Sequence, residues 1–231
     1  MIHIISPHID DAILSLGGLV MDLTNKSKRV NILYLFTISN WTNPNAISGS
    51  SYPKDEVSIS QLRKEEEKSI IDKLHYTCDF LDLHDLPLRF GNRATSEQMI
   101  INEITERLQG LITKDDLIFF PLGLDHADHI ITHKVGLQFR DVGYQVYFYE
   151  DLPYAALGNY DHQKQYDILK TQKLEPVIVE VDVHKKLDLL RQYESQMSQA
   201  WLNHIRNYSY SIKDNLYYER YWKPSGMNVN F

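Results

Sequence analysis

Residues 6–18 read SPHIDDAILSLGG, and this stretch joins a short β-rich run to a helical pattern. The run before it covers residues 3–6, and apolar side chains then recur at helical spacing over residues 12–23. Residues 30–37 (VNILYLFT) form a nearly continuous apolar run, which is typical of a parallel strand covered on both faces. These segments predict a strand–helix–strand unit with an unusually polar joint.

The same alternation continues along the chain. We expect further strands over residues 78–83, 117–120, 144–149 and 176–183, and further helices over residues 61–74, 97–111, 127–139 and 185–197. Such an order predicts an α/β fold with a Rossmann-like, mostly parallel sheet and helices on both faces. Because no repeat or linker divides the sequence, a single domain over residues 1–231 is predicted. Ligands of such sheets bind beyond the carboxyl ends of the strands.

The composition narrows the class of protein. Apolar residues make up 43% and charged residues 24% of 231, which is ordinary for a soluble folded protein. The net charge of -7 argues against a nucleic-acid partner, and no apolar run is long enough for a membrane span. One cysteine, Cys78, excludes an internal disulfide and a thiolate zinc cage. Without a signal peptide pattern, a cytoplasmic location is expected, and a homo-oligomer is left open.

Polar side chains gather after two of the predicted strands. His8, Asp10 and Asp11 follow the first strand, and the segment 125–129 (DHADH) follows the strand at 117–120. Parallel topology brings both groups to one edge of the sheet. His8 and Asp11 are three residues apart and can converge, and a histidine of the second group can join them. Two imidazoles and one carboxylate with a position left open is the composition of a catalytic zinc site.

Each group alone has a simpler explanation. The spacing of His126 and His129 is common by chance, and an acidic pair after a strand is often a helix N-cap. Two such groups at corresponding strand ends favour the metal site. Gly17 and Gly18 lie inside the first helix, where each costs ~1 kcal/mol relative to alanine. They indicate either close packing against a neighbour or a locally weak helix.

Four ordered segments resemble the PIG-L/LmbE-type zinc-dependent N-acetylglucosaminyl deacetylases. SPHIDDAILSLGG is similar to their P-H-x-D-D signature with a following G-G, and PLGLDHADH to their H-x-D-H motif. QLRKEE resembles their R-x-x-E helix, and KKLDLLRQYESQ their late Y/H-x-S-Q helix. Ile9, Ala12 and Leu124 depart from residues that many or some members carry, and none of the three is a ligand in the family pattern. The resemblance spans about residues 2–200.

The resemblance implies one Zn²⁺ per chain and a small N-acetylated sugar as the substrate. It implies His8, Asp11 and His129 as zinc ligands, and Asp10 as the general base. A protonated His126 would stabilise the oxyanion during hydrolysis of the acetamide. The expected products are acetate and a free amino sugar.

The remaining roles are weaker expectations. Asp128 would orient a histidine, Arg63 would face the substrate, and Glu150 and Tyr154 in YEDLPY would contact it. Arg63 has an equal alternative, which is an ion pair with Glu66 on a solvated helix. The segment 39–58 is either a substrate lid or a disordered loop, and the aromatic tail after residue 207 packs on the body or lines a site. An inactive sugar-binding module and a different metal hydrolase, such as a phosphoesterase, remain as rival functions.

Overall fold

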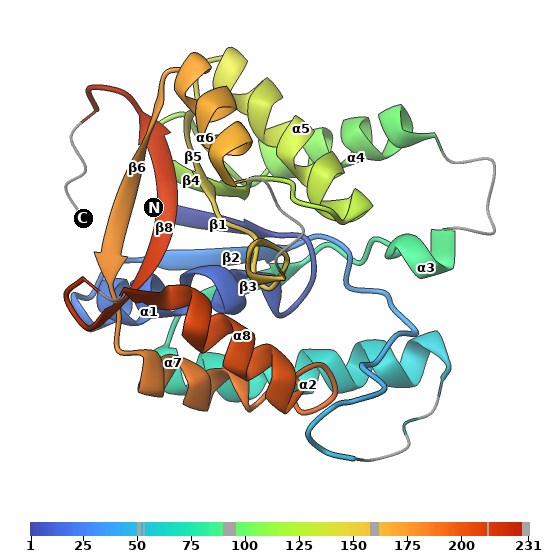
Figure 1. The fold of residues 1–231 in the computed structure, drawn as a ribbon. Coiled ribbons are helices and arrows are strands. Elements are labelled where there is room, and N and C mark those ends of the chain that lie inside the picture. Colours follow the sequence, from blue (N-terminus) through green and yellow to red (C-terminus); the bar gives the residue numbers. More distant parts are fainter. Residues whose placement is uncertain (50–51, 53, 90–95, 158–161, 212, 228–231) are drawn as a thin grey trace.

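One mixed sheet forms the centre of the computed structural model, which describes residues 1–49, 52, 54–89, 96–157, 162–211 and 213–227, without the side chains of 162–166 (Figure 1). Its strands are β1 (Ile2–Ser6), β2 (Val30–Tyr34), β3 (Thr77–Phe80), β4 (Leu117–Pro121), β5 (Gln145–Tyr149), β6 (Leu174–Glu180), β7 (Tyr210–Ser211) and β8 (Leu216–Pro224). Their order in the sheet is β3-β2-β1-β4-β5-β8-β6, and β7 pairs with β8. The predicted α/β class is therefore confirmed.

The first five strands are parallel, and the chain changes direction between β1 and β4. From β1 it moves outward through β2 to β3, and from β4 it moves the other way to β5. At such a switch point the loops after the two central strands diverge, which leaves a crevice at their carboxyl ends. The segments 7–10 and 122–126 enter this crevice directly after β1 and β4.

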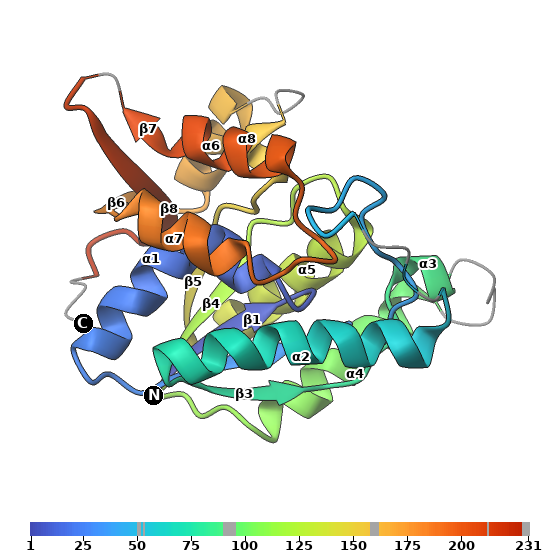
Figure 2. The same cartoon turned by 90° about the horizontal axis from the view of Figure 1, so that it is seen from below.

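The helices cover both faces of the sheet. They are α1 (Asp11–Asn25), α2 (Glu56–Leu74), α3 (Leu86–Arg89), α4 (Glu97–Gln109), α5 (Ala127–Asp141), α6 (His162–Thr171), α7 (Val183–Leu190) and α8 (Gln199–Ser209), with a 3-10 turn η1 (Tyr154–Ala156). Figures 1 and 2 show α4, α5 and α6 on one face and α1, α2, α7 and α8 on the other. The short α3 and η1 lie at the end where the parallel strands finish.

Two sequence predictions for the C-terminal part were wrong. The aromatic tail contains β8, which inserts antiparallel between β5 and β6, where no strand was predicted. The helix predicted over 185–197 ends at Leu190. Beyond it, the Ser195 backbone N–H donates to the Glu66 carboxylate at 2.6 Å, and the Ser195 hydroxyl donates to the same group at 2.8 Å. A buried side-chain acceptor thus replaces the backbone carbonyl that a continuing helix would supply.

Helix α1 packs closely at Gly18 against Val181, which follows β6, and against Glu219 of β8. A Cβ atom on Gly18 would lie 2.3 Å from Val181 Cγ1, so only glycine fits there. The close approach lets the Glu219 carboxylate of β8 accept the backbone N–H groups of Gly18 and Leu19 at 2.8 and 2.9 Å. Of the two explanations for the glycine pair, close packing is confirmed at Gly18.

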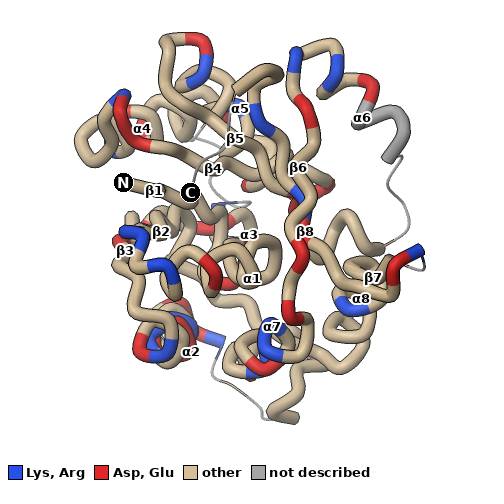
Figure 3. The backbone as a smooth tube through the Cα atoms, turned by 90° about the vertical axis from the view of Figure 1, so that its left-hand side faces the viewer, with Lys and Arg blue, Asp and Glu red and all other residues tan. Residues whose placement is uncertain are grey.

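Charged residues of both signs are interspersed along the described backbone (Figure 3). Lys186 of α7 pairs with Glu219 of β8 at 2.7 Å, with both side chains almost fully buried. None of the described helices is both long enough and apolar enough to cross a membrane.

Candidate metal centre and cavity

His8, Asp11 and His129 meet at the switch point, as the sequence predicted. Asp11 Oδ2 lies 3.0 Å from His8 Nδ1 and 3.0 Å from His129 Nε2. All three side chains are almost completely buried. His8 comes from the segment after β1, Asp11 from the first turn of α1, and His129 from the first turn of α5. The parallel topology therefore brings residues more than a hundred positions apart into contact.

Each histidine is oriented by a buried carboxylate on its other ring nitrogen. His8 Nε2 lies 3.0 Å from Asp128 Oδ2, and His129 Nδ1 lies 2.7 Å from Asp151 Oδ1. Since a carboxylate accepts hydrogen bonds, each of these nitrogens can donate a ring proton to its carboxylate, while His8 Nδ1 and His129 Nε2 face Asp11. A histidine held in this way by a carboxylate is typical of a metal ligand.

Asp128 contacts three groups around this centre. Besides His8, it accepts the Leu86 backbone N–H at 3.0 Å and pairs with the Arg89 guanidinium. It is fully buried, and its pKa is well below the usual range: burial raises it, but hydrogen bonding and charge from His8 and the charge of Arg89 outweigh that effect. This agrees with the expectation that Asp128 orients a histidine.

The electrostatics of the three central groups depend on one another. Burial lowers the pKa of His8 and of His129, but the adjacent carboxylates outweigh burial and raise these values to about 9 and about 10. Burial raises the pKa of Asp11, but the two histidines lower it well below its usual value. The cluster therefore attracts positive charge to its centre.

This centre fits a divalent metal ion. His129 Nε2 is buried and makes no hydrogen bond, although it lies 3.0 Å from Asp11 Oδ2. Candidate ligand atoms of His8, His126 and His129 also lie within 4.8 Å of one another. Imidazole nitrogens and a carboxylate oxygen are ligands that Zn²⁺ accepts.

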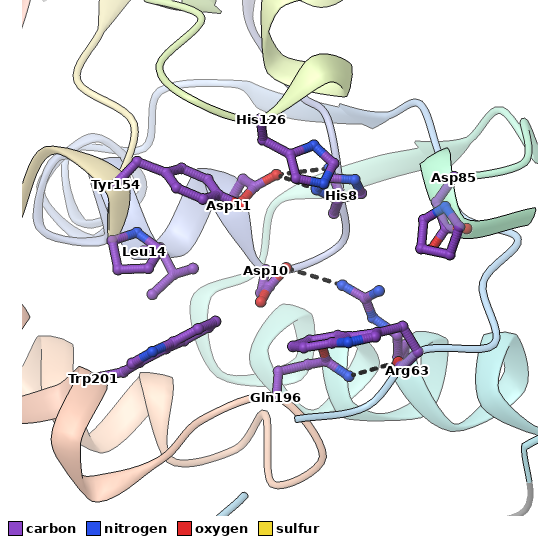
Figure 4. A pocket seen from close by; sticks show the side chains of 13 residues that line it. His8, Asp10, Asp11, Leu14, Arg63, Asp85, His126, Tyr154, Gln196 and Trp201 are labelled. Carbon is purple, nitrogen blue, oxygen red and sulfur yellow. Dashed lines mark hydrogen bonds and ion pairs between the residues drawn. The ribbon is translucent and has the colours of Figure 1, made fainter. Parts of the chain in front are cut away.

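Asp10 points away from the histidines toward Arg63. Its Oδ1 accepts from Arg63 Nη2 at 3.0 Å, and its side chain makes no capping bond to α1 (Figure 4). The N-cap explanation for the acidic pair therefore does not describe Asp10. Burial raises the pKa of Asp10, Arg63 opposes the rise, and Asp11 adds to it. Arg63 is itself buried, so the solvated-helix alternative for Arg63 and Glu66 is also wrong.

His126 has one ring nitrogen engaged by the backbone at the start of α5. Its Nδ1 accepts the Asp128 backbone N–H at 3.2 Å, which leaves the proton on Nε2. Burial and the neighbouring His8 and His129 lower the pKa of His126 to about 4. A pKa this low favours a neutral imidazole, which differs from the protonated His126 that the family resemblance implies. The ring faces the cavity and lies 6.0 Å from the ring of Tyr154.

A cavity of about 310 Å³ opens in front of this centre. That volume is at the lower end of the range for small-molecule sites, roughly 300–1,000 Å³. The described residues that line the cavity are His8, Asp10, Asp11, Leu14, Trp41, Arg63, Asp85, Pro87, His126, Pro153, Tyr154, Gln196 and Trp201. Figure 4 shows Trp201 and Gln196 across the cavity from His126.

Of the three residues expected to contact substrate, the structure brings two to the cavity wall. Arg63 and Tyr154 line it, and the Tyr154 ring packs edge-on against His129 at 5.0 Å. Glu150 does not: it lies 3.4 Å from Arg220 of β8, outside the described lining.

Sequence reasoning missed Asp151, Asp85 and the two tryptophans. Asp151 follows the predicted strand over 144–149, so the strand-end rule that found the other groups also applies to it. Asp85 likewise follows the predicted strand over 78–83, whereas Trp41 and Trp201 had no comparable signal.

The fold and the site together define the class: an α/β protein with a Rossmann-like sheet and a histidine–carboxylate centre at the switch point. The PIG-L family, described as GlcNAc-PI de-N-acetylase, matches residues 3–139, which is more than half of the chain. The chain therefore belongs to this family. No curated protein is similar enough in sequence to match it.

Several solved structures share the fold at low sequence identity. The A40926 pseudoaglycone deacetylase Dbv21 is 20% identical with a TM-score of 0.69, and 96% of each chain is covered. The zinc-inhibited form of the teicoplanin deacetylase Orf2 is 18% identical with a TM-score of 0.71 over 96% of each chain. The N,N'-diacetylchitobiose deacetylase from Pyrococcus horikoshii is 19% identical with a TM-score of 0.66, covering 96% of this chain and 83% of that one.

Proposed function

We propose that this chain is a zinc-dependent hydrolase that removes the N-acetyl group from an N-acetylglucosamine-type sugar or glycoconjugate. The observation that carries the proposal is the convergence of His8 Nδ1, Asp11 Oδ2 and His129 Nε2 beside a cavity that also contains Asp10. Membership of the PIG-L family and the deacetylases among the structural neighbours support it. The whole of residues 1–231 would form one deacetylase domain.

His8, Asp11 and His129 would hold the ion. A Zn²⁺ bound in such a site lowers the pKa of water to about 7, which makes a nucleophile available at neutral pH. Asp10 would take the proton from the attacking water as the general base. Its pKa, raised by burial and by Asp11, suits a group that must accept a proton and later release it. Arg63 would keep its carboxylate pointed into the cavity.

His126 would bind the oxygen that becomes negative when the acetamide carbonyl is attacked. Its neutral ring presents Nε2–H to the cavity, because Nδ1 is engaged by the Asp128 backbone. A fixed donor of this kind stabilises an oxyanion without a change of protonation state. The proton for the leaving amine would then come from Asp10, since a neutral His126 is a poor acid. The C–N bond breaks, and acetate and the free amine leave.

The test is acetate release from methyl N-acetyl-α-D-glucosaminide by metal-depleted and zinc-restored protein. We expect turnover only with the metal, and no hydrolysis of a phosphate ester under the same conditions. Asp10→Asn should keep the metal and the fold yet lose about 10²–10⁴-fold in kcat, which is the usual share of a general base. His129→Ala should lose the metal. A zinc-replete Asp10→Asn protein with full activity would overturn the assignment, and sugar binding without acetate release would favour the inactive binding module.

A further inference from the structure

The outer part of the cavity combines apolar walls with a carboxylate. Trp41 precedes α2 in the chain, Trp201 lies on α8, and Pro87 lies on α3. The side chains of Asp85 and Gln196 line the same cavity. All five are separate from the groups that meet at the candidate metal centre. With the acetamide at the candidate metal centre, these five residues would be available to contact the rest of the substrate.

The chain segment that carries Trp41 is held in place by hydrogen bonds. The segment 39–49 is tied to the segment after α7: the Asn43 N–H donates to the Ser195 carbonyl at 2.9 Å, and the Ile47 N–H donates to the Met197 carbonyl at 2.7 Å. Asn43 Nδ2 also donates to the Gln196 carbonyl at 2.9 Å. Trp41 nevertheless keeps 39% of its surface exposed. An anchored backbone with an exposed indole is an aromatic surface ready for a planar or apolar partner.

The charge of the wall is negative. Arg63 is the one lysine or arginine among the described lining residues, and its guanidinium is paired with Asp10. Asp85 is 3% exposed, and among the described residues its Oδ1 accepts a 3.4 Å bond from the Leu88 N–H alone. Within the described part of the chain, no basic side chain lies within ion-pair distance of Asp85. A partly desolvated carboxylate of this kind disfavours a nearby anion and accepts hydroxyl donors.

We propose that the outer cavity selects N-acetylglucosaminides whose aglycone is uncharged and apolar, with Asp85 excluding anionic aglycones and Trp41 and Trp201 stacking on apolar ones. This inference rests on the proposed function, because it names the substrate class of the same site. It separates this chain from a deacetylase for sugar phosphates, which would need a basic cradle around the aglycone. Among the described residues of the wall, a carboxylate stands in place of such a basic cradle.

The experiment compares three α-glycosides of N-acetylglucosamine, with methyl, phenyl and phosphate groups at the anomeric oxygen, on the zinc-loaded protein. They share the sugar, the acetamide and the anomeric configuration. Relative to the methyl glycoside, we expect kcat/KM to be higher for the phenyl glycoside by roughly threefold to tenfold, the scale of one aromatic contact. For the 1-phosphate it should be lower by about tenfold or more, the scale of one uncompensated charge at close range.

Two variants assign the effects to their residues. Asp85→Asn should bring kcat/KM for the 1-phosphate closer to that for the methyl glycoside. Trp201→Ala should bring kcat/KM for the phenyl glycoside closer to that for the methyl glycoside. Asp141→Asn is the matched control, because it removes one carboxylate whose side chain is 71% exposed on α5, away from the cavity. It should leave both ratios unchanged. A wild-type protein that hydrolyses the 1-phosphate as well as the methyl glycoside, or an Asp85→Asn protein with an unaltered ratio, would overturn the proposal.

Binding separates failure of this inference from failure of the proposed function. Trp41 and Trp201 line the cavity, so their fluorescence reports occupancy without turnover. If no glycoside releases acetate, the proposed function fails, and the same three ligands still test the wall by their dissociation constants. Weaker binding of the 1-phosphate than of the phenyl glycoside supports the proposed preference for uncharged, apolar aglycones. Binding of the 1-phosphate that is as tight as that of the phenyl glycoside, or tighter, overturns it.

Discussion

The N-terminal and C-terminal regions of the chain contribute differently to the site. Residues 3–139, which the family match covers, supply His8, Asp10, Asp11, His126 and His129. The region from β6 to β8 supplies Gln196 and Trp201 of the outer wall and no residue of the candidate metal centre. The reacting groups thus belong to the part of the chain that defines the family, whereas part of the wall that would choose the substrate belongs to the other. The proposed wall therefore combines Trp41, Asp85 and Pro87 of the first region with Gln196 and Trp201 of the second.

The two regions are joined by buried polar contacts. Glu219 of β8 binds the amides of Gly18 and Leu19 in α1. Glu67 of α2 accepts from the hydroxyls of Tyr34, Tyr76 and Tyr193, the last at 2.5 Å and from the C-terminal region. Changes at these contacts test whether the wall depends on the region that holds the reacting groups.

The largest effect is expected from Lys186→Met. Lys186 Nζ pairs with Glu219 at 2.7 Å, and both side chains are almost fully buried. Removing the lysine leaves a buried carboxylate with only amide donors, so we expect a loss of about 3–5 kcal/mol in the free energy of unfolding. Urea denaturation measures it. The double variant Lys186→Met with Glu219→Gln should recover part of the loss because the unpaired charge is gone. An unchanged unfolding midpoint in the single variant would show that Lys186 does not stabilise Glu219, the residue that contacts α1 across the two regions.

Glu67 should make stability depend on pH. Burial raises the pKa of Glu67 to about 7 from an ordinary 4.5, and the hydroxyls of Tyr193, Tyr34 and Tyr76 offset only part of that rise. The folded state therefore holds a proton that the unfolded state has lost, so stability falls as the pH rises from about 4.5 to about 7. The slope contributed by one such group is at most about 1.4 kcal/mol per pH unit.

Replacing Glu67 with glutamine should flatten this slope, measured by urea unfolding at pH 5, 6 and 7. Part of the slope should persist, because burial also raises the pKa of Glu66 to about 7. Glu65→Gln is the matched control, since Glu65 is exposed on the same helix and should leave the slope unaltered. If Glu67→Gln and Glu65→Gln give the same slope, the assignment to Glu67 is wrong.

The sequence predicted the N-terminal region far better than the C-terminal one. Strands β1 to β5 were all expected, because each is a short apolar run followed by polar residues or a helical pattern. Strand β8 was not, since it pairs with β5 and β6 through contacts distant in sequence, and its aromatic residues show no alternation that marks a strand. The early end of α7 depends on Glu66, whose contact with Ser195 is not visible in the local sequence.

The residues of the site also differ in how well the sequence predicted them. The strand-end rule and the family resemblance together brought His8, Asp11 and His129 to one place, and the same rule applied to Asp151 would have found the partner of His129. The neutral state of His126 follows from burial and from the two histidines around it, which only the folded structure brings together. Trp41, Asp85 and Trp201 come from three separate segments, so only the tertiary arrangement makes them one wall.

The smallest effect is expected where α1 meets the C-terminal region through Gly18. A Cβ there would lie 2.3 Å from Val181 Cγ1 and 2.7 Å from Val181 Cβ, so Gly18→Ala forces the strand end and the helix apart. Overpacking of this kind costs about 1–3 kcal/mol.

Gly17→Ala is the matched control: its Cβ would meet Ile13 Cγ2 at 3.3 Å, and the gain in helix propensity, about 1 kcal/mol, opposes that crowding. Thermal unfolding should therefore show a lower midpoint for Gly18→Ala and a nearly unchanged one for Gly17→Ala. Equal midpoints would mean that α1 and Val181 can separate freely, and the wall would then be less firmly tied to the reacting groups than Glu219 and Gly18 imply.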